Sequence, residues 1–188
     1  TCRGINIVEA EAIKALQTEL EEIQEVVVPT MKPILNKIKD EFKNYDGKTN
    51  VKNGFDAAKW CLEHGLAQQS ITIYFENIVT FFCFQFSLNC KTERERDLVN
   101  KALKFSIDDI PEKEWNFKKG EDTPQNREII KNILDSPQMI DCKKLFVKLR
   151  DLRNDFNHSG MRNNPMSADK LVSELTKLIK QINTIIIC

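Results

Sequence analysis

The apolar stretch that decides the fold runs from Phe55 to Leu88 and reads FDAAKWCLEHGLAQQSITIYFENIVTFFCFQFSL. Phenylalanines at positions 81, 82, 84 and 86 favour a strand by intrinsic propensity. The stretch contains no turn signal other than Gly65, however, and both of its parts are long for a strand. We therefore expect two buried helices that meet at Gly65.

The rest of the chain is predicted to be helical as well, because apolar residues recur every three or four positions. Outside the central stretch we expect helices at residues 8–28, 30–42, 92–105, 124–134, 137–158 and 167–187. Thr92 and Glu95 have the spacing of a capping box at the start of one of them. Residues 45–54 and 161–166 have the composition of turns. The sequence shows no repeat and no alternating strand pattern, so it predicts an all-α helical bundle.

One polar loop, residues 106–124, is longer than most connections in compact domains. It contains two aromatic residues, Trp115 and Phe117. We favour a loop that packs its own side chains onto the body of the domain. The alternative is a surface that contacts RNA or a partner chain.

The composition allows one domain with a single hydrophobic core and argues against several classes of protein. The 188 residues include 28 basic and 28 acidic side chains, so a general nucleic-acid-binding coat is not expected. No apolar run approaches the roughly 20 residues of a membrane span, and no secretory signal is visible. Six widely spaced cysteines indicate buried free thiols in the cytoplasm rather than a zinc site. Because the chain starts at Thr1, we expect it to be the C-terminal part of a longer protein.

The most informative polar residues lie near the end of the predicted 137–158 helix, in the segment LFVKLRDLRNDFNHSG at residues 145–160. At about 100° per residue, five of them fall within an arc of roughly 140°: Arg150, Arg153, Asn154, Asn157 and His158. The leucines and Phe156 of this segment face the core, and Gly160 is expected to cap the helix. Residues 143–162 hold six basic and two acidic side chains, a net charge of +4 beside this face.

This face combines the groups that RNA needs for cleavage by its own 2′-hydroxyl. Arginine can hold a phosphate through two parallel hydrogen bonds and stays charged at any working pH. Histidine suits proton transfer near neutrality. Such a reaction needs no metal, and no carboxylates are spaced to hold Mg²⁺, so we expect neither a metal nor another cofactor.

Plainer interpretations of these residues remain open at this point. A histidine near a helix C-terminus often interacts with the helix dipole, and arginines on a helix face are often solvated charge. The second histidine, His64, precedes Gly65 and has no arginine nearby in sequence. We interpret it as a capping or core residue.

Two segments resemble a known family. Arg153-Asn154-Asp155-Phe156-Asn157-His158 resembles the R-x(4–6)-H motif of HEPN domains, including the polar residue after the arginine. Residues 57–69, AAKWCLEHGLAQQ, are similar to a helix of CRISPR-associated proteins that join a CARF domain to a HEPN domain. The resemblance covers roughly residues 50–185. It implies a HEPN-like bundle at residues 51–188, preceded at 1–50 by helices that link it to a CARF domain or help it to dimerise.

What the resemblance implies about function is specific. HEPN domains dimerise so that two motifs form one composite site, and they cut single-stranded RNA without metal to leave 2′,3′-cyclic phosphate ends. In the type III CRISPR proteins of this kind, cyclic oligoadenylate binds the CARF domains and switches the HEPN dimer on. By this resemblance Arg153 contacts the scissile phosphate, His158 handles the proton and Asn154 orients a neighbour. Arg150 and Asn157 are RNA contacts by the face geometry alone.

The sequence departs from that family in one respect, because no Rossmann-like CARF domain is present in it. We therefore expect an endoribonuclease domain that forms a homodimer, with any cyclic oligoadenylate acting through a domain outside this sequence. Two alternatives are a HEPN toxin-type ribonuclease outside CRISPR and a non-catalytic helical module for dimerisation.

Overall fold

Helices make up all the regular secondary structure in the part of the chain that the structure describes, so the predicted all-α class is confirmed. The structure is a computed structural model that describes residues 4–43, 45, 50–158, 161 and 166–186. Its elements are α1 (Gly4–Glu9), α2 (Glu11–Val26), η1 (Pro29–Met31), α3 (Lys32–Phe42), α4 (Val51–Glu63), α5 (Ala67–Gln85), α6 (Glu93–Ile107), η2 (Glu112–Glu114), α7 (Pro124–Leu134), α8 (Pro137–Asn157) and α9 (Ala168–Ile186). None of these described helices is long and apolar enough to cross a membrane.

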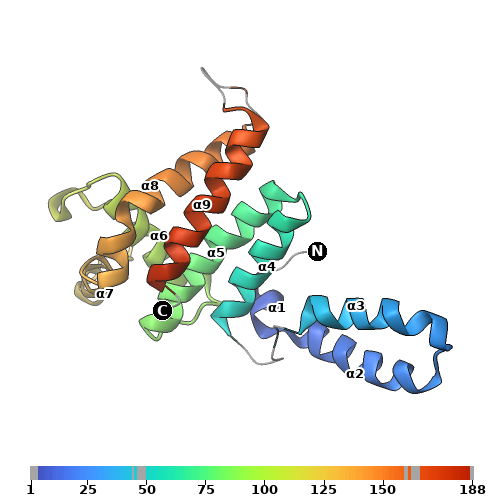
Figure 1. Cartoon of the computed structure of the whole chain (residues 1–188). Helices are drawn as coiled ribbons and strands as arrows, with labels where there is room; N and C mark the ends of the chain where they lie inside the picture. Colours follow the sequence, from blue (N-terminus) through green and yellow to red (C-terminus); the bar gives the residue numbers. More distant parts are fainter. Residues whose placement is uncertain (1–3, 44, 46–49, 159–160, 162–165, 187–188) are drawn as a thin grey trace.

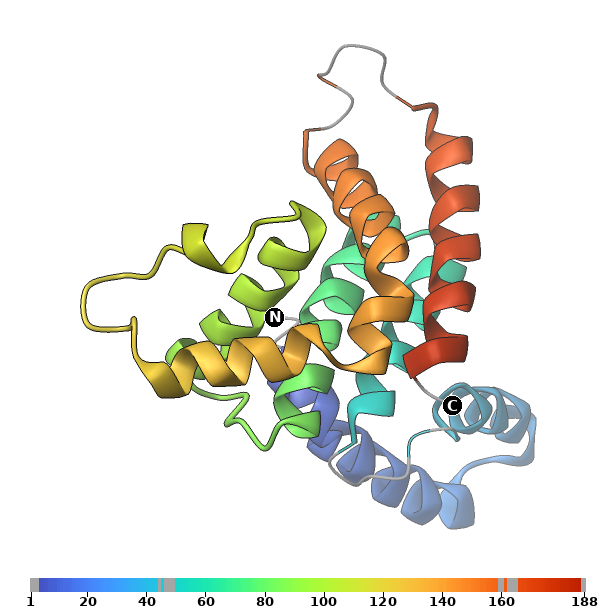
Figure 2. The same ribbon diagram turned by 90° about the vertical axis from the view of Figure 1, so that its left-hand side faces the viewer.

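Helix α5 forms the centre of the main body and packs against α4, α6 and α8 (Figure 1). Helix α9 lies along α8, and α7 packs against α6 (Figure 2). The largest fully buried side chains include Phe55 of α4, Tyr74 and Phe82 of α5, and Phe146 of α8. The hydroxyl of Tyr74 donates to Oδ1 of Asn183 on α9 at 2.7 Å. The apolar stretch that decides the fold thus supplies the centre of the core.

Two predicted boundaries around the central helices have different outcomes. Gly65 does separate α4 from α5, and its φ of +76° is a left-handed conformation that glycine adopts without strain. The predicted turn at 45–54 is wrong at its end, because α4 already begins at Val51. Asn50 caps this helix by accepting a hydrogen bond from the Lys52 amide at 2.9 Å. Gly54 is therefore helical, and its lack of a side chain makes room for Asn77 of α5.

The beginning of the chain also differs from the prediction. The expected helix at 8–28 is divided at Ala10, whose φ of +52° separates α1 from α2. Helix α1 packs against α4, where the side-chain amide of Asn53 donates to the Val8 carbonyl at 3.0 Å. This contact draws α1 onto the main body, whereas α2, η1 and α3 form a hairpin that projects from it (Figure 1).

The predicted capping box at the start of α6 is wrong in its hydrogen bonds. The Thr92 hydroxyl donates to the Asn89 carbonyl at 3.0 Å rather than accepting from the helix. Glu95 accepts from the Asn89 amide at 2.6 Å, three residues before the expected donor. The local sequence identified the start of the helix, but the side chains of Thr92 and Glu95 form their hydrogen bonds with the preceding turn instead of with each other's backbone.

Candidate functional site

Helix α8 carries the polar face predicted from the sequence. Its N-cap residue is Ser136, whose hydroxyl accepts a hydrogen bond from the Met139 amide, and its first residue is Pro137, which needs no amide hydrogen there. Leu149 and Leu152 are buried and Phe156 packs against the core, as predicted for the opposite side of the helix. The helix ends at Asn157 and His158 is its C-cap residue. Gly160, the expected cap, lies outside the described residues.

Arg153 lies against the central helix of the core. Its guanidinium carbon stands 4.5 Å from the centre of the Phe75 ring on α5, which is the geometry of a cation–π contact. The Nε atom of Arg153 is buried and has no hydrogen-bond partner among the residues that the structure describes. Within the described residues, the guanidinium group has no ion pair either. Half-burial removes part of the hydration of this cation, and no anion in the described structure replaces it.

Arg150 points to a different neighbour. Its guanidinium donates to Asp108, the residue that caps α6, at 2.5 Å, and to Asp151 at 3.2 Å. Lys143, about two turns earlier on α8, pairs with Asp109. Asp108 and Asp109 therefore neutralise part of the basic excess that the sequence places at 143–162. The structure directs Arg153 to α5 and Arg150 to the end of α6, so the two arginines share no partner.

The other three predicted site residues are exposed. Asn154, Asn157 and His158 stand at the last turn of α8, and the backbone amide of His158 donates to the Asn154 carbonyl at 3.0 Å. In the described part of the chain, none of their side chains has a hydrogen-bond or ion-pair partner. The imidazole of His158 is thus open to solvent at the end of the helix that holds Arg153.

Two residues of this region had not been singled out from the sequence. Phe75 forms the platform for Arg153, but it lies in an apolar stretch and no local pattern distinguishes it from the surrounding core residues. Asp155 is only 7% exposed, and its carboxylate accepts from the Met166 amide at 3.2 Å, which ties the chain that leads into α9 back to α8. The signal for Asp155 was available, because a carboxylate between Leu152 and Phe156 sits close to the apolar side of the helix.

His64 behaves as the sequence suggested. It is the C-cap residue of α4, its Nδ1 lies 2.8 Å from the Trp60 carbonyl, and its ring stacks on Trp60 at 4.0 Å. In the regions that the structure covers, no three His, Cys, Asp or Glu side chains gather in a way that could hold a metal ion.

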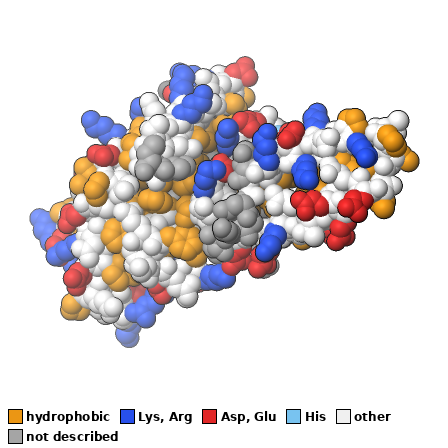
Figure 3. All heavy atoms as spheres, turned by 60° about the horizontal axis from the view of Figure 1, so that its bottom comes forward, with side chains coloured by type: hydrophobic (Ala, Val, Ile, Leu, Met, Phe, Trp, Pro, Cys, Tyr) orange, Lys and Arg blue, Asp and Glu red, His pale blue; other side chains and the backbone are white. Residues whose placement is uncertain are grey.

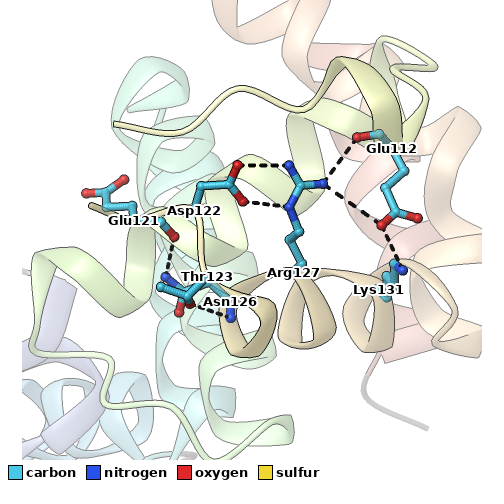
Figure 4. Close-up of polar contacts among 7 residues, drawn as sticks. All are labelled: Glu112, Glu121, Asp122, Thr123, Asn126, Arg127 and Lys131. Carbon is cyan, nitrogen blue, oxygen red and sulfur yellow. Dashed lines mark hydrogen bonds and ion pairs between the residues drawn. The ribbon is translucent and has the colours of Figure 1, made fainter. Parts of the chain in front are cut away.

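The long loop before α7 packs its own side chains onto the body, the interpretation that we favoured. Trp115 is buried, stacks on Phe105 with 5.0 Å between ring centres, and donates from Nε1 to the Ile110 carbonyl. Arg127 of α7 binds both oxygens of Asp122, at 2.6 and 3.0 Å (Figure 4). The guanidinium of Arg127 also lies 5.2 Å from the centre of the Phe117 ring. Both aromatic side chains of the loop are therefore engaged within the chain.

One cavity of the main body is lined by residues outside α8. It has a volume of about 380 Å³, and its lining includes four residues of α5, Lys91 before α6 and Arg96 in the first turn of α6. Its charged groups are already paired, Lys91 with Glu9 and Arg96 with Glu76.

Comparisons of this chain with protein-family models, with curated proteins and with solved structures find no match.

Proposed function

We propose that this chain is a HEPN-type endoribonuclease domain of type III CRISPR defence, and that two copies form one site that cuts single-stranded RNA. The observation that carries the proposal is the guanidinium of Arg153. It rests on Phe75 with a buried Nε that has no partner within the described residues. A buried nitrogen without a partner costs free energy, and arginine forms its strongest hydrogen bonds with phosphate and carboxylate oxygens.

In the proposed reaction the RNA 2′-oxygen attacks the neighbouring phosphorus and the bond from phosphorus to the 5′-oxygen breaks. The products are a 2′,3′-cyclic phosphate and a 5′-hydroxyl. Arg153 donates to the non-bridging oxygens as negative charge builds on them. His158 of one copy accepts the proton of the 2′-hydroxyl, and His158 of the second copy donates a proton to the leaving 5′-oxygen. Two copies are needed because each supplies one imidazole.

The neighbouring polar residues have supporting roles in this proposal. Asn154 orients a neighbouring side chain where the two copies meet, and Asn157 contacts RNA from its exposed position. The guanidinium of Arg150 already binds the carboxylate of Asp108, so Arg150 contacts RNA only after a phosphate replaces that carboxylate. Cyclic oligoadenylate would switch the reaction on through a CARF domain that this sequence does not contain.

The test is cleavage of single-stranded RNA in EDTA by the wild type and by Arg153→Ala and His158→Ala. Lys148→Ala is the matched control, because Lys148 is an exposed cation on the same helix. We expect cleavage to be lost in both site variants and retained in the control, while sedimentation shows that all four proteins have the same oligomeric state. Equal cutting by the wild type and the two site variants would refute the assignment.

A second candidate function is a dimerisation module without catalysis. It is favoured by the ion pairs of Lys143 with Asp109 and of Arg150 with Asp108. These pairs make the folded surface less basic than the net charge of residues 143–162 indicates. Under this alternative no variant cuts RNA, and Arg153→Ala weakens association of the chain. The two candidates therefore differ in which property the Arg153 substitution changes.

A further inference from the structure

The hairpin formed by α2, η1 and α3 carries an unusual share of exposed apolar surface. Ten large hydrophobic side chains are exposed in the described residues, and half of them lie between positions 23 and 34: Ile23, Val26, Val28, Met31 and Ile34. Most of them lie at or beside the turn that joins α2 to α3, and hydrophobic side chains are visible at that end of the hairpin in Figure 3. Ile34 also lines a hollow that α3 shares with Trp60 of α4. Single exposed hydrophobic residues are ordinary, but a concentrated patch on a projecting element indicates an interaction surface.

The hairpin is also poorly packed within itself. Leu20 is the single buried residue of α2, and neither η1 nor α3 has one within the described hairpin. The two helices contact each other through polar groups, such as Gln24 with Asn36 at 2.8 Å and Lys39 with Glu21 at 3.8 Å. A two-helix layer of this kind leaves its apolar stripe half covered, and a further layer of helices is the usual solution.

The charges of the hairpin indicate what supplies that layer. Helix α2 carries five glutamates and one lysine, a net charge of −4, whereas α3 carries three lysines and two acidic residues, a net charge of +1. Acidic side chains gather along one edge of the hairpin and lysines lie above them (Figure 3). A two-fold axis that sets a second hairpin antiparallel to the first places each α2 beside the α3 of the other copy, so both contacts join opposite charges.

We propose that two copies of this chain associate through their hairpins, as an antiparallel four-helix bundle with α2 of each copy beside α3 of the other. The apolar residues at positions 23–34 supply its core and the opposite charges set its register. The glutamates beside the patch oppose binding to an anionic lipid surface. The contact uses none of the residues of the proposed ribonuclease site and does not depend on it.

The experiment measures self-association of the full chain by sedimentation velocity at micromolar concentrations. One variant reverses acidic charge on α2, Glu22→Lys with Glu25→Lys, and a second reverses basic charge on α3, Lys32→Glu with Lys37→Glu. All four positions are exposed. We expect each variant alone to associate about tenfold more weakly than the wild type, and an equimolar mixture of the two to recover wild-type association.

Recovery in the mixture is specific to this geometry, because only a mixed dimer pairs each reversed α2 with a reversed α3. A matched pair of charge reversals on the main body, Glu128→Lys with Lys180→Glu, leaves association unchanged. Far-UV circular dichroism verifies that the variants keep their helix content. A monomeric wild type overturns the inference, and so does a mixture that stays as weak as its components or a monomer that floats with anionic vesicles.

The outcome is separable from that of the ribonuclease proposal. If the hairpin variants dimerise and cut RNA like the wild type, the hairpin contact is wrong and the ribonuclease site stands. If the charge exchange restores association while Arg153→Ala cuts RNA normally, the hairpin contact stands and the ribonuclease assignment fails.

Discussion

Replacing Gly54 with alanine is expected to destabilise the protein, although alanine is the better helix former by about 1 kcal/mol. Gly54 lies in the first turns of α4, facing Asn77 of α5. A β-carbon at position 54 would stand 2.1 Å from Oδ1 and 2.4 Å from Cγ of Asn77. Contacts this short require a side chain to move.

Asn77 cannot move without cost. It is 3% exposed, and its Nδ2 donates to the Val51 carbonyl at 2.9 Å. Overpacking costs about 1–3 kcal/mol, and loss of a buried hydrogen bond costs about another 1–3 kcal/mol. After the gain in helix propensity, we expect a net loss of about 1–5 kcal/mol in the free energy of unfolding. Urea unfolding followed by far-UV circular dichroism measures this quantity.

A double-mutant cycle tests the cause. In an Asn77→Ala background the obstructing atoms are absent, so Gly54→Ala should cost little or become stabilising. Gly65→Ala is the matched control: no atom lies within 4 Å of its added β-carbon, and its cost of about 1 kcal/mol comes from the positive φ in either background. The reasoning is refuted if Gly54→Ala is as stable as the wild type, or if its cost is the same in both backgrounds.

Three further predictions concern other parts of the molecule. Phe75→Leu removes the aromatic face under Arg153 and should weaken RNA cleavage about 2- to 30-fold, with folding stability changed by less than about 1.5 kcal/mol; unchanged cleavage would contradict the platform role. Burial raises the pKa of the Cys83 and Cys142 thiols to about 11. Because these thiols ionise more easily in the unfolded chain, the free energy of unfolding should fall as the pH rises from 9 toward 11. At neutral pH, alkylation of the native protein followed by mass spectrometry should find both thiols unmodified. Arg127→Ala releases the loop before α7, and limited trypsin digestion should then cleave that loop faster than in the wild type; equal rates would argue against the clamp.

Much of the fold was predictable because its determinants are local. The apolar periodicity of α8 predicted which side is buried, and Gly65 predicted the break between α4 and α5. What could not be predicted depends on contacts between distant segments. Gly54 was assigned to a turn from its neighbours, whereas its actual role is to admit Asn77. The boundary at Ala10 has no glycine or proline to mark it, so the division between α1 and α2 went unseen.

The candidate site shows the same contrast between features set by local sequence and features set by contacts between distant segments. The sequence identified the face that holds Arg153 and His158, because both residues lie on one helix at a fixed angular spacing. It did not identify Phe75, since the ring comes from α5, or the pairing of Arg150 with Asp108, since that carboxylate ends α6. Helical spacing predicts which residues share a face, but the neighbours of that face are decided by tertiary packing.

The two tryptophans give the chain two separate fluorescence reporters. Trp115 is buried, stacks on Phe105 and donates to the Ile110 carbonyl, so its emission reports on the core. Trp60 is half-buried, stacks on His64, and donates from Nε1 to Glu41 of α3 at 3.2 Å, so its emission reports on the seating of the hairpin. Replacing either one with phenylalanine isolates the other. Movement of the hairpin and unfolding of the body can thus be followed as distinct optical signals in two single-tryptophan variants.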